Sequence, residues 1–330
     1  MIKHQSRLFT KIVLIGFVLL AIYTSYMIFF PKLVPNQRYM LVVNKGESLA
    51  AISNQLGQDH VVENQRVFRL LIKLSGKDKN VAAGIYVFKN STSLWEIVKR
   101  LISGKPDQIS ITILDGWTIN DLRAYVDKLP YIQHLSVNMT DLQLKDLLKI
   151  KAPNLEGLFY PSTYFIVPNQ TDLEIYQNAY RLMQNRLNQL YANRSSNSNY
   201  ANSYQMLIMA SLIQKETSNP KDMYMISTVF NNRLRIGMKL QDDPSVFYGL
   251  KDRDHVVRKD FQIDTPYNTY LHYGLPPSPI CIPSDAALIA ASDPNGDPKL
   301  LYFIATGGGE TKFSDSYKEH KTNVNRYLHK

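Results

Sequence analysis

A long uncharged stretch near the N-terminus constrains this chain more than any other feature. No Asp, Glu, Lys or Arg occurs from Ile12 to Phe30. About 20 consecutive apolar residues span the hydrocarbon core of a bilayer as a helix. A cleaved signal peptide would end in small residues, whereas this stretch ends in the bulky residues YMIFF. We therefore expect a retained transmembrane helix over residues 12–30, preceded by a cytoplasmic N-terminus over residues 1–11.

The basic residues around this stretch set its expected orientation. Lys3, Arg7 and Lys11 precede it, and Lys32 and Arg38 follow it. Lys and Arg are enriched on the cytoplasmic side of membrane helices. The slight excess before the helix predicts a single-pass protein of the cell inner membrane, with the rest of the chain in the periplasm.

The composition limits the classes of partner. The chain has 330 residues, 45% of them hydrophobic, which is enough for two domains or three small ones. Its formal net charge of +10 favours an anionic partner. The Lys and Arg residues are scattered and form no nucleic-acid-binding fingerprint, so we expect no nucleic-acid partner.

Metal and cofactor sites have little support. Cys281 is the only cysteine, which excludes a disulfide framework and a cysteine-rich metal centre. No two histidines have the H-x-x-x-H spacing of a zinc enzyme. The TGGGE segment from Thr306 lacks the lysine of a phosphate-binding loop. We therefore expect neither a metal nor a cofactor.

A small module is expected over residues 39–104, after a linker over residues 31–38. Its signals are strands at Met40–Val43 and Gly84–Val87, and helices that begin at Ser48, Asn64 and Ser93. The strand–helix–helix–strand order, with KGESLAAISNQL and AGIYVF, resembles a LysM-like glycan-binding module. A small α+β spacer without a ligand is the other interpretation.

Residues 105–150 are expected to connect this module to a larger domain over residues 151–330. The connecting segment combines a strand at Ile109–Leu114 with a helix that Thr118 caps. The larger part alternates helices with short extended segments, which predicts an α+β protein with a mixed α/β domain at its C-terminal end.

Two segments of the larger domain are expected to be irregular. Met238–Leu250 contains DDP, which is typical of a turn. Asp264–Pro283 is rich in proline, polar residues and tyrosine, which is typical of a loop that lines a cleft. An ordinary surface loop pinned by its aromatic side chains is the other interpretation of the second segment.

The helix that ends in MASLIQKETSNP places an acid among apolar residues. Glu216 follows Ile213 and Met209 at helical spacing, so its carboxyl shares their apolar stripe. Burial beside apolar groups raises the pKa of a carboxyl, as a glycosidase acid requires. A solvated residue in a last helical turn is the other interpretation, which the neighbouring Gln214 and Lys215 favour.

Ordinary glycoside hydrolysis needs a second carboxylate beside the first. Asp242 and Asp243 are the nearest candidates along the chain. Ser211 and Lys215 also form a serine–lysine pair, but at i and i+4. Penicillin-binding enzymes use the i, i+3 spacing, which argues against serine–lysine chemistry.

Several long motifs occur in one order along the chain. They are KET around Glu216, FNNRLRIGMKLQDDPSVFYG at 230–249, DTPYNTYLHYGLPPSPI at 264–280 and LYFIATGGG from Leu301. With the N-terminal anchor and the small module, they cover nearly the whole chain. The sequence therefore resembles the membrane-anchored endolytic murein transglycosylases, the MltG or YceG-like family.

The resemblance implies that Glu216 is the catalytic acid of a lytic transglycosylase. Such an enzyme cleaves the bond between N-acetylmuramic acid and N-acetylglucosamine in nascent strands without water. The muramyl C6 hydroxyl attacks C1 of its own ring and leaves a 1,6-anhydro end, which terminates strand elongation. Because the substrate supplies the nucleophile, one carboxyl serves first as acid and then as base.

The resemblance also suggests residues that position sugar hydroxyls or the N-acetyl group. These are Gln241, Asp243, Tyr248, Asn268 and Tyr270, with Glu156 as a further candidate and second acid. Asn232 and Arg233 lie in the same motifs. Arg233 falls on an apolar stripe, which suggests a buried structural pair as readily as a substrate contact.

The sequence departs from the family pattern at three positions. Ser162 replaces the acid of the usual PDTY, Asp242 replaces a common Thr, and Lys312 replaces a common His. These departures weaken any role for the three positions and leave Glu216 untouched.

The expected partners are peptidoglycan glycan strands, the inner membrane and glycan-synthesising penicillin-binding proteins. Two other functions remain open at this point. One is a muramidase-type hydrolase that uses Glu216 as acid and Asp243 as base. The other is a peptidoglycan-binding scaffold without catalysis.

Overall fold

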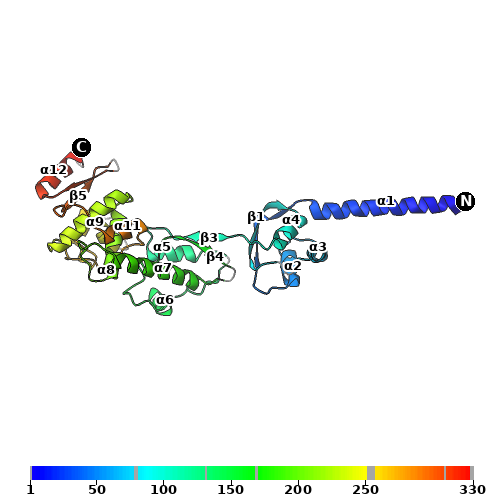
Figure 1. Ribbon diagram of the computed structural model, residues 1–330, viewed down its shortest axis with the longest axis horizontal. Coiled ribbons are helices and arrows are strands. Elements are labelled where there is room, and N and C mark those ends of the chain that lie inside the picture. Colours follow the sequence, from blue (N-terminus) through cyan, green and yellow to red (C-terminus); the bar gives the residue numbers. More distant parts are fainter. Residues whose placement is uncertain are drawn as a thin grey trace. The chain divides into compact units, whose positions relative to one another are not determined.

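The chain folds into two compact units. The structure, a computed structural model, describes residues 2–77, 81–130, 132–167, 170–250, 257–307 and 310–327. Unit 1 comprises residues 1–110 and 165–170, and unit 2 comprises residues 111–164 and 171–330. Both units mix helices with short strands, so the α+β class is confirmed (Figure 1).

Helix α1 (Ile2–Phe29) contains the apolar stretch. Its segment Lys11–Phe29 is long and apolar enough to cross a membrane, as the sequence predicted. The helix begins well before residue 12, because the preceding residues also adopt helical conformation. Near its C-terminal end, the Phe29 ring lies 6.0 Å from the ring of Trp95.

Unit 1 continues with a two-stranded sheet and three helices. The elements are β1 (Lys32–Val43), α2 (Leu49–Gln58), α3 (Gln65–Leu74), β2 (Gly84–Thr92) and α4 (Leu94–Ile102). The prediction of a linker over residues 31–38 is wrong. Strand β1 already begins at Lys32, which pairs with Thr92 of the antiparallel strand β2. That pairing joins residues far apart in sequence, and a local pattern does not reveal it.

The helix starts of unit 1 follow from side-chain caps. Ser48 accepts a hydrogen bond from the backbone N–H of Ala51 at 3.1 Å, and Asn64 accepts one from Val67 at 3.2 Å. Ser93 forms a capping box with Glu96 at the start of α4. Such caps satisfy N–H groups that lack a partner within the helix. The three helix starts predicted from the sequence are confirmed.

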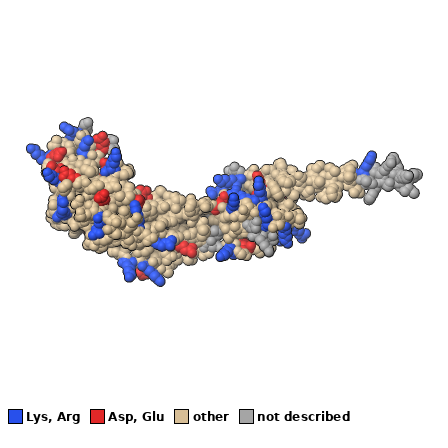
Figure 2. Space-filling view, viewed as in Figure 1, with Lys and Arg blue, Asp and Glu red and all other residues tan. Residues whose placement is uncertain are grey.

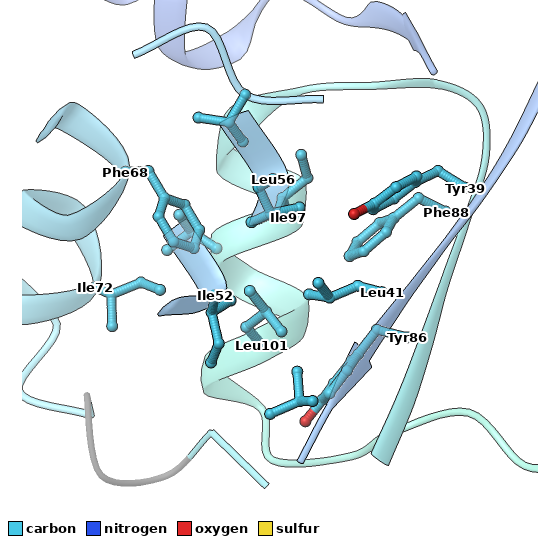
Figure 3. Close-up of a cluster of buried hydrophobic side chains, with 13 residues drawn as sticks. Tyr39, Leu41, Ile52, Leu56, Phe68, Ile72, Tyr86, Phe88, Ile97 and Leu101 are labelled. Carbon is cyan, nitrogen blue, oxygen red and sulfur yellow. The ribbon is translucent and has the colours of Figure 1, made fainter. Parts of the chain in front are cut away.

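The core of unit 1 lies between the sheet and its helices. Figure 3 shows Leu41 and Tyr86 of the strands facing Ile52 of α2 and Leu101 of α4. Phe68 of α3 is also fully buried in this cluster. The module therefore has a hydrophobic core of its own, as an independently folded unit requires.

Unit 2 is mainly helical, with two short strand pairs. The elements that follow α4 are β3 (Ile109–Thr112), α5 (Ile119–Val126), α6 (Asp141–Leu147), β4 (Thr163–Ile166), α7 (Asp172–Ala192), α8 (Ser203–Glu216), α9 (Pro220–Arg235), α10 (Asp243–Gly249), the 3₁₀ helix η2 (Arg258–Gln262), α11 (Asp285–Ser292), β5 (Tyr302–Ala305), β6 (Thr311–Ser314) and α12 (Tyr317–Tyr327). Strands β3 and β4 pair and carry the chain between the units. The predicted bounds 39–104, 105–150 and 151–330 stay predictions.

Helix α8 forms the centre of unit 2. It packs against α7, α9, α10 and α11 (Figure 1). Every side chain from Met206 to Ile213 is buried. A helix that is buried all round is typical of the middle of a large core. The small residues Ala287, Ala290 and Ala291 of α11 are fully buried and suit close packing of that helix against its neighbours.

The segment Met238–Leu250 was expected to be irregular, and that prediction is wrong. Residues 243–249 form α10. Asp242 is its N-cap, and Pro244 lies in its first turn, where a missing N–H costs nothing. Asp-Asp-Pro thus starts a helix here. The Pro-rich segment Asp264–Pro283 contains no helix or strand, as expected.

The C-terminal part of unit 2 is a hairpin followed by α12. β5 pairs antiparallel with β6, with Phe303 opposite Phe313. Gly308 and Gly309, the end of the LYFIATGGG motif, lie outside the described residues.

We predict that truncation of a core residue of α8 destabilises the protein strongly. Leu207→Ala removes a fully buried side chain, so unfolding should require about 2–5 kcal/mol less free energy. Leu182→Ala, at a side chain that is 42% exposed on α7, is the matched control and should cost about 1 kcal/mol or less. Chemical unfolding of the full-length protein in detergent measures both. Equal costs would contradict the central position of α8.

Candidate active site

Helix α8 determines where the candidate acid lies. The helix ends at Glu216, and the extended Thr217 donates its backbone N–H to the carbonyl of Ile213 at 3.3 Å. Glu216 is half-buried, one turn beyond the last fully buried residue. Glu216 therefore lies on the predicted apolar face of the helix, and its carboxyl is located where that face leaves the core.

The residues beside the acid fix the last turn of α8. Gln214 accepts a hydrogen bond at Oε1 from the backbone N–H of Ser284 at 2.9 Å. Lys215 Nζ donates to the carbonyl of Gly116 at 2.8 Å. Both side chains had suggested a simple solvated surface. They instead tie the helix end to two loops of unit 2, which restricts the position of the carboxyl.

Glu216 faces a cavity of about 440 Å³ within unit 2. The walls come from α8, α9, the turn before α10, the loop after η2, the β5–β6 hairpin and α12. Of the residues predicted from the sequence, the structure brings together Glu216, Gln241, Asp243 and Tyr270. The segment Asp264–Pro283 was expected to line a cleft, and among its residues Tyr270 lines this cavity.

A second acid, Asp242, lies against Glu216. Its side chain is fully buried. Oδ2 accepts the backbone N–H of Ser245 at 2.8 Å, which caps α10. Oδ1 receives no hydrogen bond from another group among the described residues. The side chains of Glu216 and Asp242 also interact with each other.

The environment of the two carboxyl groups favours retention of a proton. Burial raises the pKa of Glu216 well above its ordinary value, and the neighbouring Asp242 and Asp243 raise it further. Arg233 opposes this effect. Burial also raises the pKa of Asp242, to about 6, although hydrogen bonds from Glu216 and Ser245 favour its charged form. Glu216 is therefore the member of the pair that keeps its proton.

Arg233 combines a structural and an electrostatic role. Its Nε donates to the carbonyl of Leu301 at 2.7 Å, and its Nη1 donates to the carbonyl of Leu240. These bonds fix the chain before β5 and the turn before α10. Burial lowers the pKa of Arg233, which also faces the Glu216–Asp242 pair. The buried cation thus offsets negative charge in the cavity.

Asn232 holds the same region without lining the cavity. Its Nδ2 donates to the carbonyl of Asp297 at 3.1 Å and to that of Leu300 at 2.9 Å. Its Oδ1 accepts from Arg235 at 2.9 Å. The motif residues Asn232 and Arg233 therefore connect α9 to the chain that enters the β5–β6 hairpin.

Gln241, Asp243 and Tyr270 present polar groups beside the acid. The Tyr270 hydroxyl donates to Asp243 Oδ1 at 2.5 Å. Burial raises the pKa of Tyr270, and Asp243 adds to this effect, so the hydroxyl stays protonated. Gln241 has a left-handed backbone with φ 49°. Such strain in a residue other than glycine is most often retained where it aims a functional side chain.

Glu156 and Tyr248 lie elsewhere among the described residues. Glu156 is buried, and its Oε1 accepts the backbone N–H of Ile119 at 2.9 Å at the start of α5. The Tyr248 hydroxyl donates to Glu156 Oε2 at 3.0 Å. Neither side chain lines the cavity at Glu216. Their contacts favour a role in joining α5 to α10.

Asn268 acts on the site through the loop that carries Tyr270. Its side chain is fully buried, and its Nδ2 donates to the carbonyls of Phe261 and Ile263 at 2.9 and 2.8 Å. Its Oδ1 accepts the backbone N–H of Tyr270 at 3.0 Å. The predicted substrate-binding residue therefore shapes the loop that places Tyr270.

Three of the lining residues from the C-terminal end carry polar aromatic rings, and they were not predicted as site residues. They are Tyr302 of β5 and Tyr317 and His320 of α12. The rings of Tyr302 and His320 stack at 5.2 Å. Tyr302 lies in the LYFIATGGG motif, which was a usable signal. Nothing in the sequence of α12 indicates that it faces the acid.

Among the residues that the structure describes, no cluster of three or more His, Cys, Asp or Glu side chains is arranged to hold a metal ion. The cavity is lined by carboxyl groups, a buried guanidinium, hydroxyl groups and an imidazole. Proton transfer by Glu216 is the chemistry that this arrangement supports most directly.

Comparisons with known proteins agree on one family. A family model described as YceG-like matches residues 41–326. An endolytic murein transglycosylase of Bacillus subtilis is 31% identical over 305 residues, covering 87% of this chain and 84% of that protein. A Streptococcus pneumoniae protein of the same name is 24% identical and covers 93% of this chain, which spans 62% of the streptococcal protein. The crystal structure of a YceG-like protein from Listeria monocytogenes has a TM-score of 0.53 at 26% identity, covering 87% of this chain and 99% of that one.

We predict that Glu156→Gln destabilises the fold. The substitution places an amide N–H₂ beside groups that need an acceptor, so unfolding should require about 1–3 kcal/mol less free energy. Glu174→Gln is the matched control, because Glu174 also accepts a backbone N–H at a helix start but is exposed. Chemical unfolding of both variants, monitored by circular dichroism, measures the two free energies of unfolding. No loss at Glu156, or equal losses, would contradict the structural role.

Proposed function

We propose the function of this chain from the premise that it belongs to the YceG-like family. It is an endolytic murein transglycosylase, a lyase that acts on peptidoglycan, as its relatives in Bacillus subtilis and Streptococcus pneumoniae are named. The proposal concerns the residues that carry the reaction, its product and the place of the enzyme at the membrane.

Glu216 is the general acid in this proposal. One observation carries the assignment: its carboxyl emerges from the buried helix α8 into the cavity, where burial and Asp242 raise its pKa. A protonated carboxyl can donate to the oxygen of a glycosidic bond as that bond breaks. The bond is the one between N-acetylmuramic acid and N-acetylglucosamine, the substrate class of the family.

The same carboxyl then acts as the base. Glu216 gives its proton to the oxygen that leaves C1 of the muramyl residue, and the C1–O bond breaks. The C6 hydroxyl of that residue forms a bond to C1 and passes its proton to the Glu216 carboxylate. The products are a 1,6-anhydro end and a free hydroxyl on N-acetylglucosamine. No water is consumed, and Glu216 regains its proton.

Asp242 sets the protonation of the acid. A Thr at this position would also cap α10 through its hydroxyl, but it would lack the second carboxyl oxygen. Asp242 Oδ1 is buried without a hydrogen bond from another described group, and the Asp242 side chain interacts with Glu216. We therefore assign Asp242 as a positioning residue that holds the Glu216 proton toward neutral pH. The departure from the family pattern had weakened this position, and its geometry argues for a role.

Polar groups around the acid can bind the sugar. Arg233 supplies positive charge beside the carboxyl pair. The hydrogen-bonded pair of Asp243 and Tyr270 and the strained Gln241 face the same cavity. These three polar side chains suit hydroxyl and N-acetyl groups of the substrate. Tyr317 adds an aromatic side chain to the cavity wall, against which a pyranose ring can pack.

The apolar helix α1 fits a membrane anchor, and membrane association is typical of the family. We propose that α1 crosses the inner membrane once, with both units in the periplasm, where nascent strands emerge. Glycan-synthesising penicillin-binding proteins are the proposed protein partners. The strand–helix–helix–strand order of β1, α2, α3 and β2 supports a LysM-like, glycan-binding assignment of this module.

A muramidase-type hydrolase is the strongest rival. It would use Asp243 as base to activate water. The Asp243 carboxylate already accepts a hydrogen bond from Tyr270 at 2.5 Å, which suits a positioning role. The identity of the product separates the two reactions, because a hydrolase leaves a reducing muramic acid and a transglycosylase leaves an anhydro end.

We predict that Glu216→Gln lowers murein cleavage at least about 100-fold while folding and glycan binding persist. Asp243→Asn is the comparison, and its residual product should still carry anhydro ends. Incubation of the full-length protein with murein, followed by mass spectrometry of the fragments, measures both. Products of the unmodified enzyme that end in reducing muramic acid would contradict the transglycosylase mechanism. Undiminished cleavage by Glu216→Gln would remove Glu216 from the reaction.

We predict that Asp242→Thr shifts the pH dependence of cleavage. Asp242 raises the pKa of Glu216, so its removal lowers that pKa and deprotonates the acid at lower pH. The alkaline limb of kcat/KM should move to lower pH. The Thr hydroxyl keeps the α10 cap, which separates the electrostatic effect from loss of folding. An unchanged limb, or one that moves to higher pH, would contradict the role of Asp242.

A further inference from the structure

A second cavity lies within unit 1, away from the residues assigned to catalysis. Its volume is about 890 Å³. It is bounded by β1, β2, α4 and the residues that follow α4 up to Ser110. Four cations line it, which are Arg38, Lys89, Lys99 and Arg100, against two acids, Glu96 and Asp107. Figure 2 shows Lys and Arg side chains gathered on this unit.

Both acids in the cavity are already occupied by protein donors. Glu96 Oε2 accepts the backbone N–H of Ser93 at 2.8 Å and its hydroxyl at 3.1 Å. Asp107 Oδ2 accepts the backbone N–H of Val87 at 2.6 Å, and its Oδ1 forms an ion pair with Arg100. Asp107 therefore offsets the charge of Arg100, whereas Glu96 keeps its own charge, and the four cations outnumber the two acids in the cavity lining.

Three of the cations have no partner of their own. The side chains of Arg38, Lys89 and Lys99 form no hydrogen bond or ion pair with any other described residue, and all three are exposed. They come from β1, β2 and α4, so the fold brings together charges that lie far apart in sequence. Converging cations around a hollow are an arrangement that binds a phosphate group, because Arg and Lys both pair well with phosphate oxygens.

The position of α4 connects this cavity to the end of the apolar helix α1. Trp95 of α4 contacts Phe29 at the C-terminal end of the membrane-spanning segment, with ring centroids 6.0 Å apart. Trp and Tyr side chains concentrate at the level of lipid headgroups. Lys99 follows Trp95 at i+4, so it lies on the same face of α4, about 6 Å further along the axis.

We propose that this cavity binds the phosphate of an anionic membrane lipid next to α1. The anchor keeps the cavity at the headgroup layer, so lipid phosphates are present there at high effective concentration. Basic residues beside a membrane segment attract anionic lipids by about 1 kcal/mol each. A bound lipid would hold unit 1 against the membrane surface. The inference is independent of the chemistry assigned to Glu216.

The test measures lipid binding to the full-length protein in a neutral detergent. Native mass spectrometry counts bound phosphatidylglycerol and, separately, bound zwitterionic phosphatidylcholine during titration. The unmodified protein should bind one phosphatidylglycerol saturably and prefer it to phosphatidylcholine. Equal binding of the two lipids would overturn the proposal.

Two double variants separate the cavity from overall charge. Lys89→Gln with Lys99→Gln removes two cavity cations and should weaken phosphatidylglycerol binding about 10-fold or more. Lys73→Gln with Lys77→Gln removes the same charge from exposed lysines outside the cavity and should leave binding within about twofold. Equal weakening in both would mean that only net charge matters, which contradicts a built site. Circular dichroism verifies folding of each variant.

Two further ligands test the source of the anion. Inorganic phosphate should displace the lipid only weakly, because it lacks attachment to the membrane. Displacement by inorganic phosphate at concentrations comparable to the lipid would assign a soluble anion instead. Peptidoglycan fragments with stem-peptide carboxylates should bind both double variants alike. Selective loss of fragment binding in the Lys89–Lys99 variant, with lipid binding intact, would make the cavity a glycan site.

Discussion

The burial of α8 on every side is the constraint on which unit 2 depends. Four helices pack around it, and its side chains from Met206 to Ile213 are inaccessible to solvent. An acid placed at the end of such a helix leaves the core without becoming fully hydrated. The partial negative charge at a helix C-terminus disfavours ionisation there as well. Helix α8 thus determines both where the Glu216 carboxyl lies and how readily it keeps its proton.

A second helix supplies the opposite environment at the same place. Asp242 caps α10, where the backbone N–H of Ser245 stabilises a negative charge. The carboxyl at the end of α8 therefore meets a carboxylate at the start of α10. Environments that push two neighbouring pKa values apart assign the acid and its partner. Here they leave the proton on Glu216, and Arg233 limits the cost of the negative charge beside it.

Local signals in the sequence were sufficient for much of this architecture. Helix caps such as Ser93 and the apolar stripe that ends in Glu216 depend on neighbours within one or two turns. The start of β1, strand β6 and the α12 wall of the cavity depend on long-range packing, which no local pattern encodes. Asp242 shows a third case. The sequence Asp-Asp-Pro is typical of a turn. Only the folded structure brings the Asp242 carboxyl next to Glu216, and this proximity gives Asp242 its proposed role.

The central claim is that Glu216 carries a proton at neutral pH in the free enzyme. Infrared difference spectroscopy with ¹³C-labelled glutamate measures this directly, by subtracting the spectrum of the Glu216→Gln variant from that of the unmodified protein at pH 7. The account predicts a labelled, protonated carboxyl band that disappears in the variant and is replaced by a carboxylate band only at higher pH. A difference spectrum that contains only the ionised carboxylate at pH 7 would contradict it.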